Sequence, residues 1–332
     1  KLDIRTQIET THRVKLDARF NPLLCACLIT GSYSKGFIGW HAEVGTVEAE
    51  RIRKAETSFS TFGPVKPIVG GAVAPVHAHP YLAGLVIDVF GLPGPSACGG
   101  SLLSDRRVLT AAHCWNDGRF QAWRFTVVLG SAFLFHGGLR IPTSNVAMHP
   151  LYNPHTLAND VMMVALPVIV PFSHMIRPIT LPFGRYTAMD FTGMWAQASG
   201  YGRYSDLTNP TTMTMVRNIF LQTIPLNQCR AVYGNIVLDS NICTNGAGGV
   251  GICRGDSGGP LVVHSGGIDL LVGVSSFVAF DGFVFHKMMV ISVFFRSIIY
   301  YVMYLPISNR HFYFSILGFR PKDQTEPYCC RS

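Results

Sequence analysis

Three short stretches of the sequence carry side chains that together could cleave an acyl bond. Ser257 lies in the glycine-rich stretch GDSGGP, His113 follows an apolar run in LTAAHCW, and Asp160 stands in LANDVMMVAL. A serine hydroxyl can attack a carbonyl carbon when a histidine takes its proton and a carboxylate orients that histidine. Each stretch alone is weak, because a lone histidine beside a strand is more often structural. In the order His, Asp, Ser, they predict a nucleophilic acyl-transfer site.

The segments that must position these residues have the texture of a β-protein. From Ile68 to Asp281, short apolar runs alternate with Gly, Pro, Asn and Asp, without a strand–helix–strand alternation. This spacing predicts an all-β sandwich or barrel. The expected strands lie within residues 81–90, 101–112, 124–135, 161–170, 194–202, 218–225, 260–265 and 269–278.

The composition divides the chain into three parts. Residues 1–67 contain the apolar stretch PLLCACLIT, which has the length of a signal-peptide core, and a stretch of helical composition at 46–59. We therefore assign 1–67 to a signal peptide and an activation propeptide. Residues 282–332 are rich in Phe, Ile, Tyr and Val but lack the turn spacing of 68–281. We set them apart as an atypical hydrophobic segment, of the kind that mis-splicing or a frameshift would produce.

The charge distribution excludes some classes of partner. The net charge is +8, but residues 68–281 contain 11 Arg, 10 Asp, no Lys and no Glu. The basic surplus therefore lies in the two ends, and no basic stripe indicates a nucleic-acid partner. Arginine keeps its charge at a pH at which lysine loses it. The composition therefore indicates an alkaline fluid, with compositional drift as the alternative.

The cysteines and histidines give no metal site. No pair of cysteines within 68–281 has the C-x-x-C spacing of zinc ligands, so we expect disulfides, an oxidising compartment, and neither metal nor cofactor. His77 and His79 are too isolated for zinc, and we expect them at an exposed strand end. GAGGVG at 246–251 matches a dinucleotide motif but leads into the serine turn rather than a helix.

Five motifs follow one another in a recognisable order. They are IVGG at 68–71, CGGSLL at 98–103, TAAHC at 110–114, NDVMMVAL at 159–166 and GDSGGP at 255–260. In this order the chain resembles the chymotrypsin-like serine endopeptidases over about 68–281. The WHAEVG…EAERIRKAE stretch resembles propeptides of insect digestive members, and the Lys-free part resembles enzymes of alkaline caterpillar guts. The resemblance implies two packed six-stranded antiparallel β-barrels, the second incomplete at its C-terminal part.

The resemblance also implies a role for each site residue. Ser257 would be the nucleophile, His113 its general base, and Asp160 the carboxylate that holds the imidazole. The backbone N–H groups of Gly255 and Ser257 would form the oxyanion hole. Proteolysis would free the amine of Ile68, which would pair with Asp256.

The sequence departs from the family pattern at the activation site. The family has a basic residue directly before this isoleucine, whereas this chain reads Lys66-Pro67-Ile68. Cleavage after Lys66 would leave Pro67 as the terminus, one residue too long for the pair between Ile68 and Asp256.

The resemblance implies the disulfides Cys98–Cys114 and Cys229–Cys243. Cys253 would pair beyond the pocket wall, but no cysteine follows until Cys329. The base of the specificity pocket would be Gly251, which carries no charge and favours large apolar residues, as in chymotrypsin. The pocket wall would be made by Ser276, Phe277 and Val278.

We therefore predict a secreted serine endopeptidase zymogen that acts in digestion. Its partners would be protein and peptide substrates, an activating protease and protein inhibitors, without nucleic acid or membrane. One alternative is a catalytically inactive homologue that acts as a binding protein. A second alternative is a membrane-tethered protease using residues 288–306, although Arg296 lies near the centre of that stretch.

Overall fold

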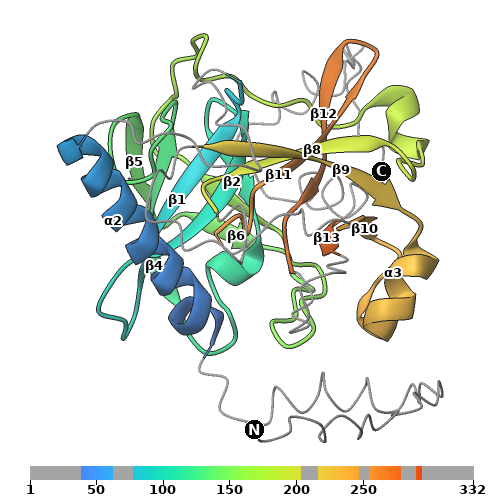
Figure 1. Cartoon of the computed structure of the whole chain (residues 1–332), viewed down its shortest axis with the longest axis horizontal. Coiled ribbons are helices and arrows are strands. Elements are labelled where there is room, and N and C mark those ends of the chain that lie inside the picture. The colour runs from blue at the N-terminus through green and yellow to red at the C-terminus, as the bar shows by residue number, and fades with distance from the viewer. Residues whose placement is uncertain (1–38, 63–77, 203–215, 247–254, 278–288, 294–332) are drawn as a thin grey trace, which may run out of the picture. The chain divides into compact units, whose positions relative to one another are not determined.

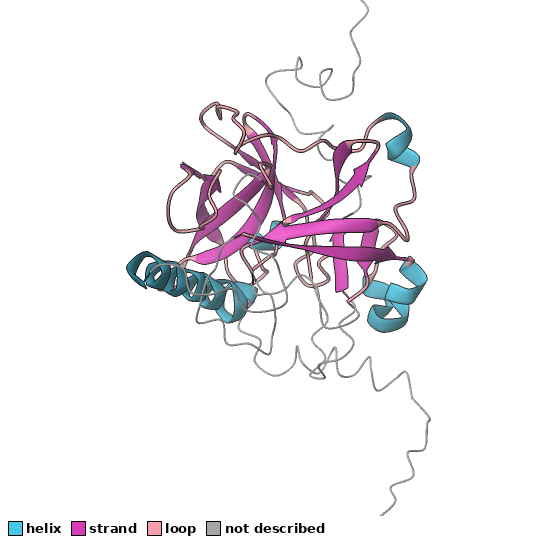
Figure 2. Ribbon diagram, turned by 45° about the horizontal axis from the view of Figure 1, so that its top comes forward, coloured by secondary structure: helices cyan, strands magenta, loops and turns pink. Residues whose placement is uncertain are grey.

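The computed structural model describes residues 39–62, 78–202, 216–246, 255–277 and 289–293. These residues form two curled antiparallel sheets with few helices (Figures 1 and 2). The all-β prediction with two barrels is therefore confirmed. The predictions that concern Ile68, Gly251, Cys253 and Val278 lie outside the described residues.

The first sheet has seven strands in the order β5-β4-β1-β2-β3-β7-β6. Its two edge strands are consecutive in the chain and are separated only by Ser144 and Asn145. The sheet therefore curls on itself, because β5 and β6 form one bent segment. This segment pairs with β4 through β5 and with β7 through β6. The strands are β1 (Leu82–Val89), β2 (Ser96–Ser104), β3 (Arg107–Thr110), β4 (Ala122–Leu129), β5 (Leu139–Thr143), β6 (Val146–Met148) and β7 (Met162–Ala165). We expected six strands, and the seventh arises because this bent segment counts as two.

The second sheet has six strands in the order β12-β11-β8-β9-β10-β13. They are β8 (Trp195–Gly200), β9 (Arg217–Ile224), β10 (Asn241–Thr244), β11 (Pro260–Ser265), β12 (Ile268–Val274) and β13 (Met289–Val293). The edge strand β13 pairs antiparallel with β10. It comes from the part of the chain, 282–332, that the sequence led us to set apart from the domain.

The helices are few, and the longest of them precedes β1. Residues 46–59 were predicted to be helical, and α2 confirms this while continuing to Phe62. The short helix α3 was not predicted; it begins after Pro225 and ends at Gly234, whose φ of +65° suits a glycine at a helix end. The helices are the π-helix η1 (His41–Gly45), α2 (Thr46–Phe62), α3 (Leu226–Tyr233), and the 3-10 helices η2 (Ala112–Cys114), η3 (Gly184–Ala188) and η4 (Gly234–Ile236).

The two sheets share a hydrophobic core. The inward residues of the first sheet, such as Leu85 and Phe125, are fully buried. The same cluster includes Val262, Leu271 and Val274 from the second sheet. Burial of apolar surface therefore holds the two sheets against each other, and the candidate site lies where their strands end.

The helices that the structure describes include none with the length and apolar character needed to cross a membrane. Of residues 288–306, only 289–293 are described, and they form a strand.

Candidate active site

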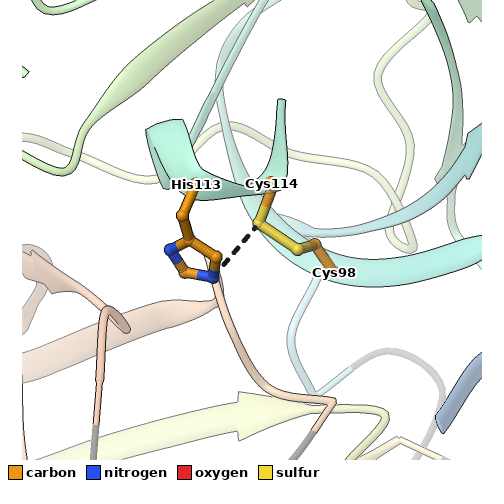
Figure 3. Close-up of side chains that lie close together, drawn as sticks. All are labelled: Cys98, His113 and Cys114. Carbon is orange, nitrogen blue, oxygen red and sulfur yellow. Dashed lines mark hydrogen bonds between the residues drawn. A yellow bond between two sulfur atoms is a disulfide. The ribbon is translucent and has the colours of Figure 1, made fainter. Parts of the chain in front are cut away.

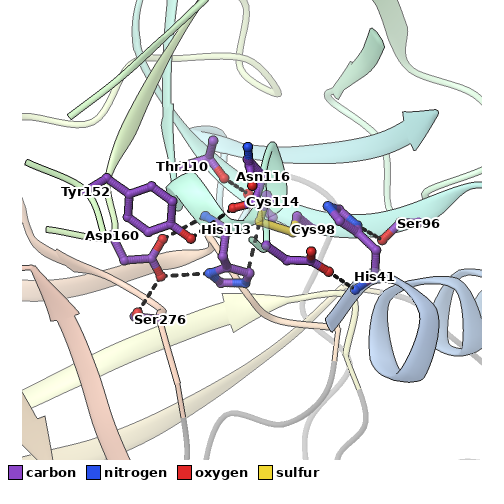
Figure 4. The surroundings of a disulfide bond; sticks show 12 residues. His41, Ser96, Cys98, Thr110, His113, Cys114, Asn116, Tyr152, Asp160 and Ser276 are labelled. Atoms are coloured by element: carbon purple, nitrogen blue, oxygen red, sulfur yellow. Dashed lines mark hydrogen bonds and ion pairs between the residues drawn. A yellow bond between two sulfur atoms is a disulfide. The ribbon is translucent and has the colours of Figure 1, made fainter. Parts of the chain in front are cut away.

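His113 and Asp160 form a buried pair. The imidazole Nδ1 of His113 lies 2.7 Å from Oδ2 of Asp160, and the backbone N–H of His113 donates to Oδ1 at 2.8 Å. The carboxylate of Asp160 is fully buried and His113 is only 2% exposed. Figure 4 shows both contacts. Two hydrogen bonds to one carboxylate fix both the position and the orientation of the imidazole.

The register of the first sheet explains why two residues 47 positions apart meet. In the pairing of β3 with β7, Thr110 lies opposite Met162. His113 follows Thr110 on η2, and Asp160 precedes Met162, so both leave the sheet at the same end. Asn159 has a φ of +54°. This left-handed conformation is one that asparagine tolerates better than most residues, and it turns the chain into Asp160.

Ser276 completes the surroundings of Asp160. Its Oγ donates to Oδ2 of Asp160 at 2.5 Å, in a buried contact that reaches across from the end of β12 (Figure 4). Burial alone would raise the pKa of Asp160, but the charge of His113 and hydrogen bonds from His113 and Ser276 lower it. The sequence led us to place Ser276 only in the pocket wall. Its contact with Asp160 depends on how the two sheets pack, which the sequence pattern does not reveal.

The turn that carries Ser257 is held by its backbone. The N–H of Gly99 on β2 donates to the carbonyl of Ser257 at 2.7 Å. The turn also bonds to the segment that follows β12 in the second sheet. The N–H of Gly258 donates to the carbonyl of Ser275 at 2.7 Å, and the N–H of Ser275 donates to the carbonyl of Gly259 at 2.9 Å. The turn is therefore hydrogen-bonded both to the first sheet and to the segment after β12.

Glycine is required at Gly258 by both conformation and space. Its φ is +79°, and a Cβ there would collide with Oγ1 of Thr110 and lie 2.5 Å from the carbonyl oxygen of Gly99. Thr110 itself donates to that carbonyl at 2.7 Å, so neither neighbour is free to move. Gly255 also has a positive φ, of +97°. The GDSGGP motif thus reflects close contact between two backbones.

The candidate nucleophile and base do not share a hydrogen bond in the described part of the chain. Nε2 of His113 is instead 3.9 Å from Sγ of Cys114. Catalytic hydrogen bonds are often long or poorly aligned before substrate binds, so the missing hydrogen bond is compatible with a base and its nucleophile.

Asp256 lies against a glycine turn after β8. Its Oδ1 accepts a hydrogen bond from the N–H of Gly202 at 2.8 Å. A Cβ on Gly200 or on Gly202 would collide with the Asp256 carboxylate. These two glycines therefore make the space that Asp256 occupies. The expected partner, the amine of Ile68, lies outside the described residues.

Within the described residues, two disulfides form, Cys98–Cys114 and Cys229–Cys243. The first joins β2 to η2 and so fixes the turn that carries His113; the second joins α3 to β10. His113 and the sulfurs of Cys98 and Cys114 lie close enough to resemble a metal cluster (Figure 3). Cysteine binds a metal as a thiolate, and both sulfurs are committed to the disulfide, so this group does not fit a metal.

Of the expected pocket, Ser276 and Phe277 are described, whereas Gly251 and Val278 are not. The ring of Phe277 lies 6.0 Å from that of Tyr233 on α3, in an edge-to-face arrangement. Phe277 packs beside the Cys229–Cys243 disulfide. Its ring therefore packs the segment after β12 against α3.

The expectation of an exposed strand end at His79 was wrong, while His77 lies outside the described residues. His79 is 6% exposed and lies just before β1. Its Nε2 is 2.9 Å from Nδ2 of Asn218 on β9, and its Nδ1 is 3.3 Å from the hydroxyl of Tyr81. Packing of the second sheet against this segment buries a side chain that the sequence places in a polar, proline-flanked stretch.

The chain is similar in sequence to known proteins over its protease-like part. Residues 68–283 match the family model described as Trypsin. A collagenase of Hypoderma lineatum is 34% identical over 216 residues, covering 65% of this chain and 78% of that protein. Alkaline trypsin B of Manduca sexta is 33% identical, covering 64% of this chain and 82% of that protein. Brachyurin of Leptuca pugilator is 34% identical, covering 65% and 88% respectively.

A solved structure, that of HL collagenase, has a similar fold. It superposes with a TM-score of 0.64 at 31% sequence identity, covering 73% of this chain and all of that chain.

Proposed function

Because the chain belongs to the trypsin family of serine proteases and is a serine endopeptidase, we propose that His113, Asp160 and Ser257 carry its catalysis. The observation that best supports this assignment is the fully buried carboxylate of Asp160, which accepts both the backbone N–H of His113 and a contact from its Nδ1. Burying a carboxylate costs desolvation free energy. These donors offset that cost, and they do so only when the imidazole of His113 has one orientation.

In the proposed mechanism, Ser257 Oγ attacks the carbonyl carbon of the scissile peptide bond. Nε2 of His113 takes the serine proton and then gives it to the leaving amine, which leaves an acyl-enzyme on Ser257. Water, deprotonated by His113, then hydrolyses the ester. Asp160 keeps Nδ1 protonated and stabilises the imidazolium while it exists.

The N–H groups of Gly255 and Ser257 are the proposed donors to the oxyanion. Neither has a protein acceptor among the described residues. Gly255 has a φ that suits glycine, and the turn is fixed by the bonds of Gly99 and Gly258. Donors fixed before the reaction stabilise the oxyanion without the cost of reorienting them.

The chain is proposed to be a zymogen whose new terminus at Ile68 pairs with Asp256. The glycine-lined site of Asp256 supports this proposal. Asp256 precedes Gly258 by two positions in the chain, and its carboxylate accepts a hydrogen bond from Gly202. An amine beside it would fix the loop that carries Gly255. The reading Lys66-Pro67-Ile68 requires an activating protease that cleaves after proline or a second trimming step.

The substrate preference is proposed to be chymotrypsin-like. Gly251, at the expected base of the pocket, offers no carboxylate to attract Arg or Lys. The wall of the pocket would be formed by Ser276, Phe277 and Val278. Large apolar side chains of the substrate would fill the pocket. The names of the trypsin relatives do not argue for this preference, so it depends on Gly251 alone.

The protein is further proposed to be secreted and to act in digestion in an alkaline fluid, with protein inhibitors as partners. The word alkaline in the name of the Manduca sexta relative supports this, as does the use of Arg without Lys from Ile68 to Asp281. The two disulfides indicate an oxidising compartment.

The test uses the full chain with Pro64-Val65-Lys66-Pro67 replaced by Ile-Glu-Gly-Arg, so that factor Xa cuts before Ile68. A fluorophosphonate probe is added, and labelling is followed to completion. We expect one equivalent of label on the peptide that contains Ser257, none in Ser257→Ala, and full labelling in the control Ser265→Ala. If the cut chain takes no label, it is a binding homologue and the proposed catalysis is wrong.

A further inference from the structure

The segment that precedes the protease domain is docked on it. The helix α2 lies along the first sheet (Figures 1 and 2). Its residues Ala49 and Ile52 are fully buried. They pack in one cluster with Leu82, Ala97, Val128, Leu134, Tyr201 and Val216. The partners come from the first sheet, from the loop after β4, and from the residues just after β8 and just before β9. One face of α2 therefore fits a surface that the domain provides.

Glu56 anchors the helix in a specific position. Its side chain is fully buried. The N–H groups of Leu134 and Phe135 donate to its two oxygens at 2.6 and 2.9 Å, and Nδ1 of His136 lies 2.9 Å away. Burial raises the pKa of Glu56 while these donors oppose the shift. Placing a carboxyl group in the interior with three matched donors gives a contact that depends on position, unlike apolar packing.

The first turns of α2 lie close to Gly255, whose N–H is a proposed oxyanion donor. Glu48 is fully buried and pairs with Arg51 at 2.5 Å. Arg51 also donates to the carbonyl of Tyr201 at 3.5 Å. The Cβ of Glu48 is 3.8 Å from the point at which a Cβ on Gly255 would lie. The first turns of α2 therefore lie against both Tyr201, just after β8, and the neighbourhood of Gly255.

The residues before α2 cover the candidate base. The ring of Trp40 lies 4.7 Å from that of His113, edge-to-face at 71°. His41 is fully buried, its Nδ1 is 2.9 Å from Oγ of Ser96, and its N–H donates to Asp117 at 2.8 Å (Figure 4). A general base must reach the leaving group of a substrate. His113 is only 2% exposed with Trp40 beside it.

We propose that residues 39–62 are an intramolecular inhibitor of this protease, an inference that rests on the proposed function of His113. The surface around Leu134 and Tyr201 binds α2, and Glu56 fixes the helix so that Trp40 lies against His113. None of these contacts depends on the peptide bond before Ile68. Cleavage there therefore leaves the inhibitor bound, and full activity requires a second step that removes or digests residues 39–62.

The test measures the rate of hydrolysis of a peptide substrate by the full chain with the factor Xa site, after complete cleavage before Ile68. We expect Trp40→Ala and Glu56→Gln to hydrolyse it about tenfold faster than the parent, because each loses a central contact of the docked segment. The matched control is Val47→Ala, since Val47 is on α2 but 47% exposed. Its rate should equal that of the parent. Equal rates for the parent, Trp40→Ala and Glu56→Gln would overturn the proposal while leaving the proposed catalysis intact.

A second measurement does not require activity. In the full chain carrying Ser257→Ala, diethyl pyrocarbonate modifies accessible imidazoles, and mass spectrometry follows the peptide that contains His113. We expect Trp40→Ala to speed the modification of His113 about tenfold and to leave that of the exposed His155 unchanged. If protection of His113 is the same with and without Trp40, the inference is wrong, even in a chain that proves catalytically inactive.

Discussion

His113 and Asp160 are fixed by side-chain hydrogen bonds, whereas Ser257 is fixed by its backbone and by the glycines around it. In the first group, which also includes Ser276, three donors converge on one buried carboxylate. In the second, residues 255–260, the bonds join backbone groups of Ser257 and Gly258 to Gly99 and Ser275. We call these the acid–base half and the nucleophile half of the site.

This difference decides what a substitution does. In the acid–base half, a changed side chain alters charge and proton transfer while the strands keep their register. In the nucleophile half, an added Cβ meets backbone that is itself hydrogen-bonded, so stability and chemistry fail together. The side chains of the acid–base half thus have a chemical role, whereas the glycines of the nucleophile half have a conformational one.

Asp160→Asn should have the largest effect on catalysis. The amide cannot hold the imidazole in the required tautomer or stabilise its cation, so kcat should fall by about 10⁴. The fold should persist, with circular dichroism like that of the parent. The control Asp239→Asn changes a carboxylate that is 94% exposed, and its kcat should not change. Activity within tenfold of the parent in Asp160→Asn would remove Asp160 from the proposed machinery.

Gly258→Ala should break the nucleophile half through the fold. The methyl group would collide with Thr110 and Gly99 in a backbone conformation that alanine resists, which costs about 3 kcal/mol or more in the free energy of unfolding. Gly267→Ala is matched, because Gly267 has a similar φ of +77° but no neighbouring atom within 4 Å. It should lose about 1 kcal/mol.

Urea unfolding of the cleaved chain checks both variants. Equal losses at Gly258 and Gly267 would show that conformation alone, and not the approach of the two sheets, requires glycine at Gly258.

The comparison also explains what the sequence could reveal. Motifs with fixed local chemistry, such as GDSGGP and TAAHC, identify the candidate residues, because turn glycines and a histidine after a strand are local features. Most strands were predicted, since short apolar runs bounded by turn residues are local too. Those missed, such as β5 and β10, are short or contain proline.

Contacts made across sheets could not be predicted in the same way. Ser276 reaches Asp160 over a separation of 116 residues, and His79 meets Asn218 over 139 residues. No periodicity encodes such pairings. The docked position of α2 was missed for the same reason: helical composition predicts the helix but not the surface that buries Glu56.

A third link between the sheets, through His79, should weaken in acid. Burial lowers the pKa of His79 from its usual 6.5 to about 4, opposed weakly by the charge of Asp269. The facing groups are Tyr81 and Asn218, and the Asn218 amide can donate to Nε2 only while that nitrogen is unprotonated. Below about pH 6.5 the unfolded chain therefore binds a proton that the folded chain excludes. The free energy of unfolding should fall by about 2 kcal/mol at pH 5 and be fully restored above pH 6.5.

Urea unfolding at pH 5 and pH 7.5 measures this loss, and His79→Gln should reduce the difference by about that amount. His155→Gln, at an exposed loop residue, should keep the full difference. A difference that persists unchanged in His79→Gln would assign the acid sensitivity to other groups, of which His41, whose pKa burial also lowers to about 4, is the first to test.

Ser276→Ala should have the smallest effect and the most selective one. It removes one of the donors to Asp160, and a hydrogen bond to a charged group contributes enough to lower kcat/KM about tenfold. With this donor gone, the pKa of Asp160 rises toward the value that burial favours, so the acid limb of the pH profile for the Asp160–His113 pair should move to higher pH. Ser276→Thr keeps a hydroxyl and should restore the limb, while Ser265→Ala should leave it in place. A tenfold loss with an unmoved acid limb would mean that Ser276 only shapes the substrate pocket, and the acid–base half would then reduce to His113 and Asp160.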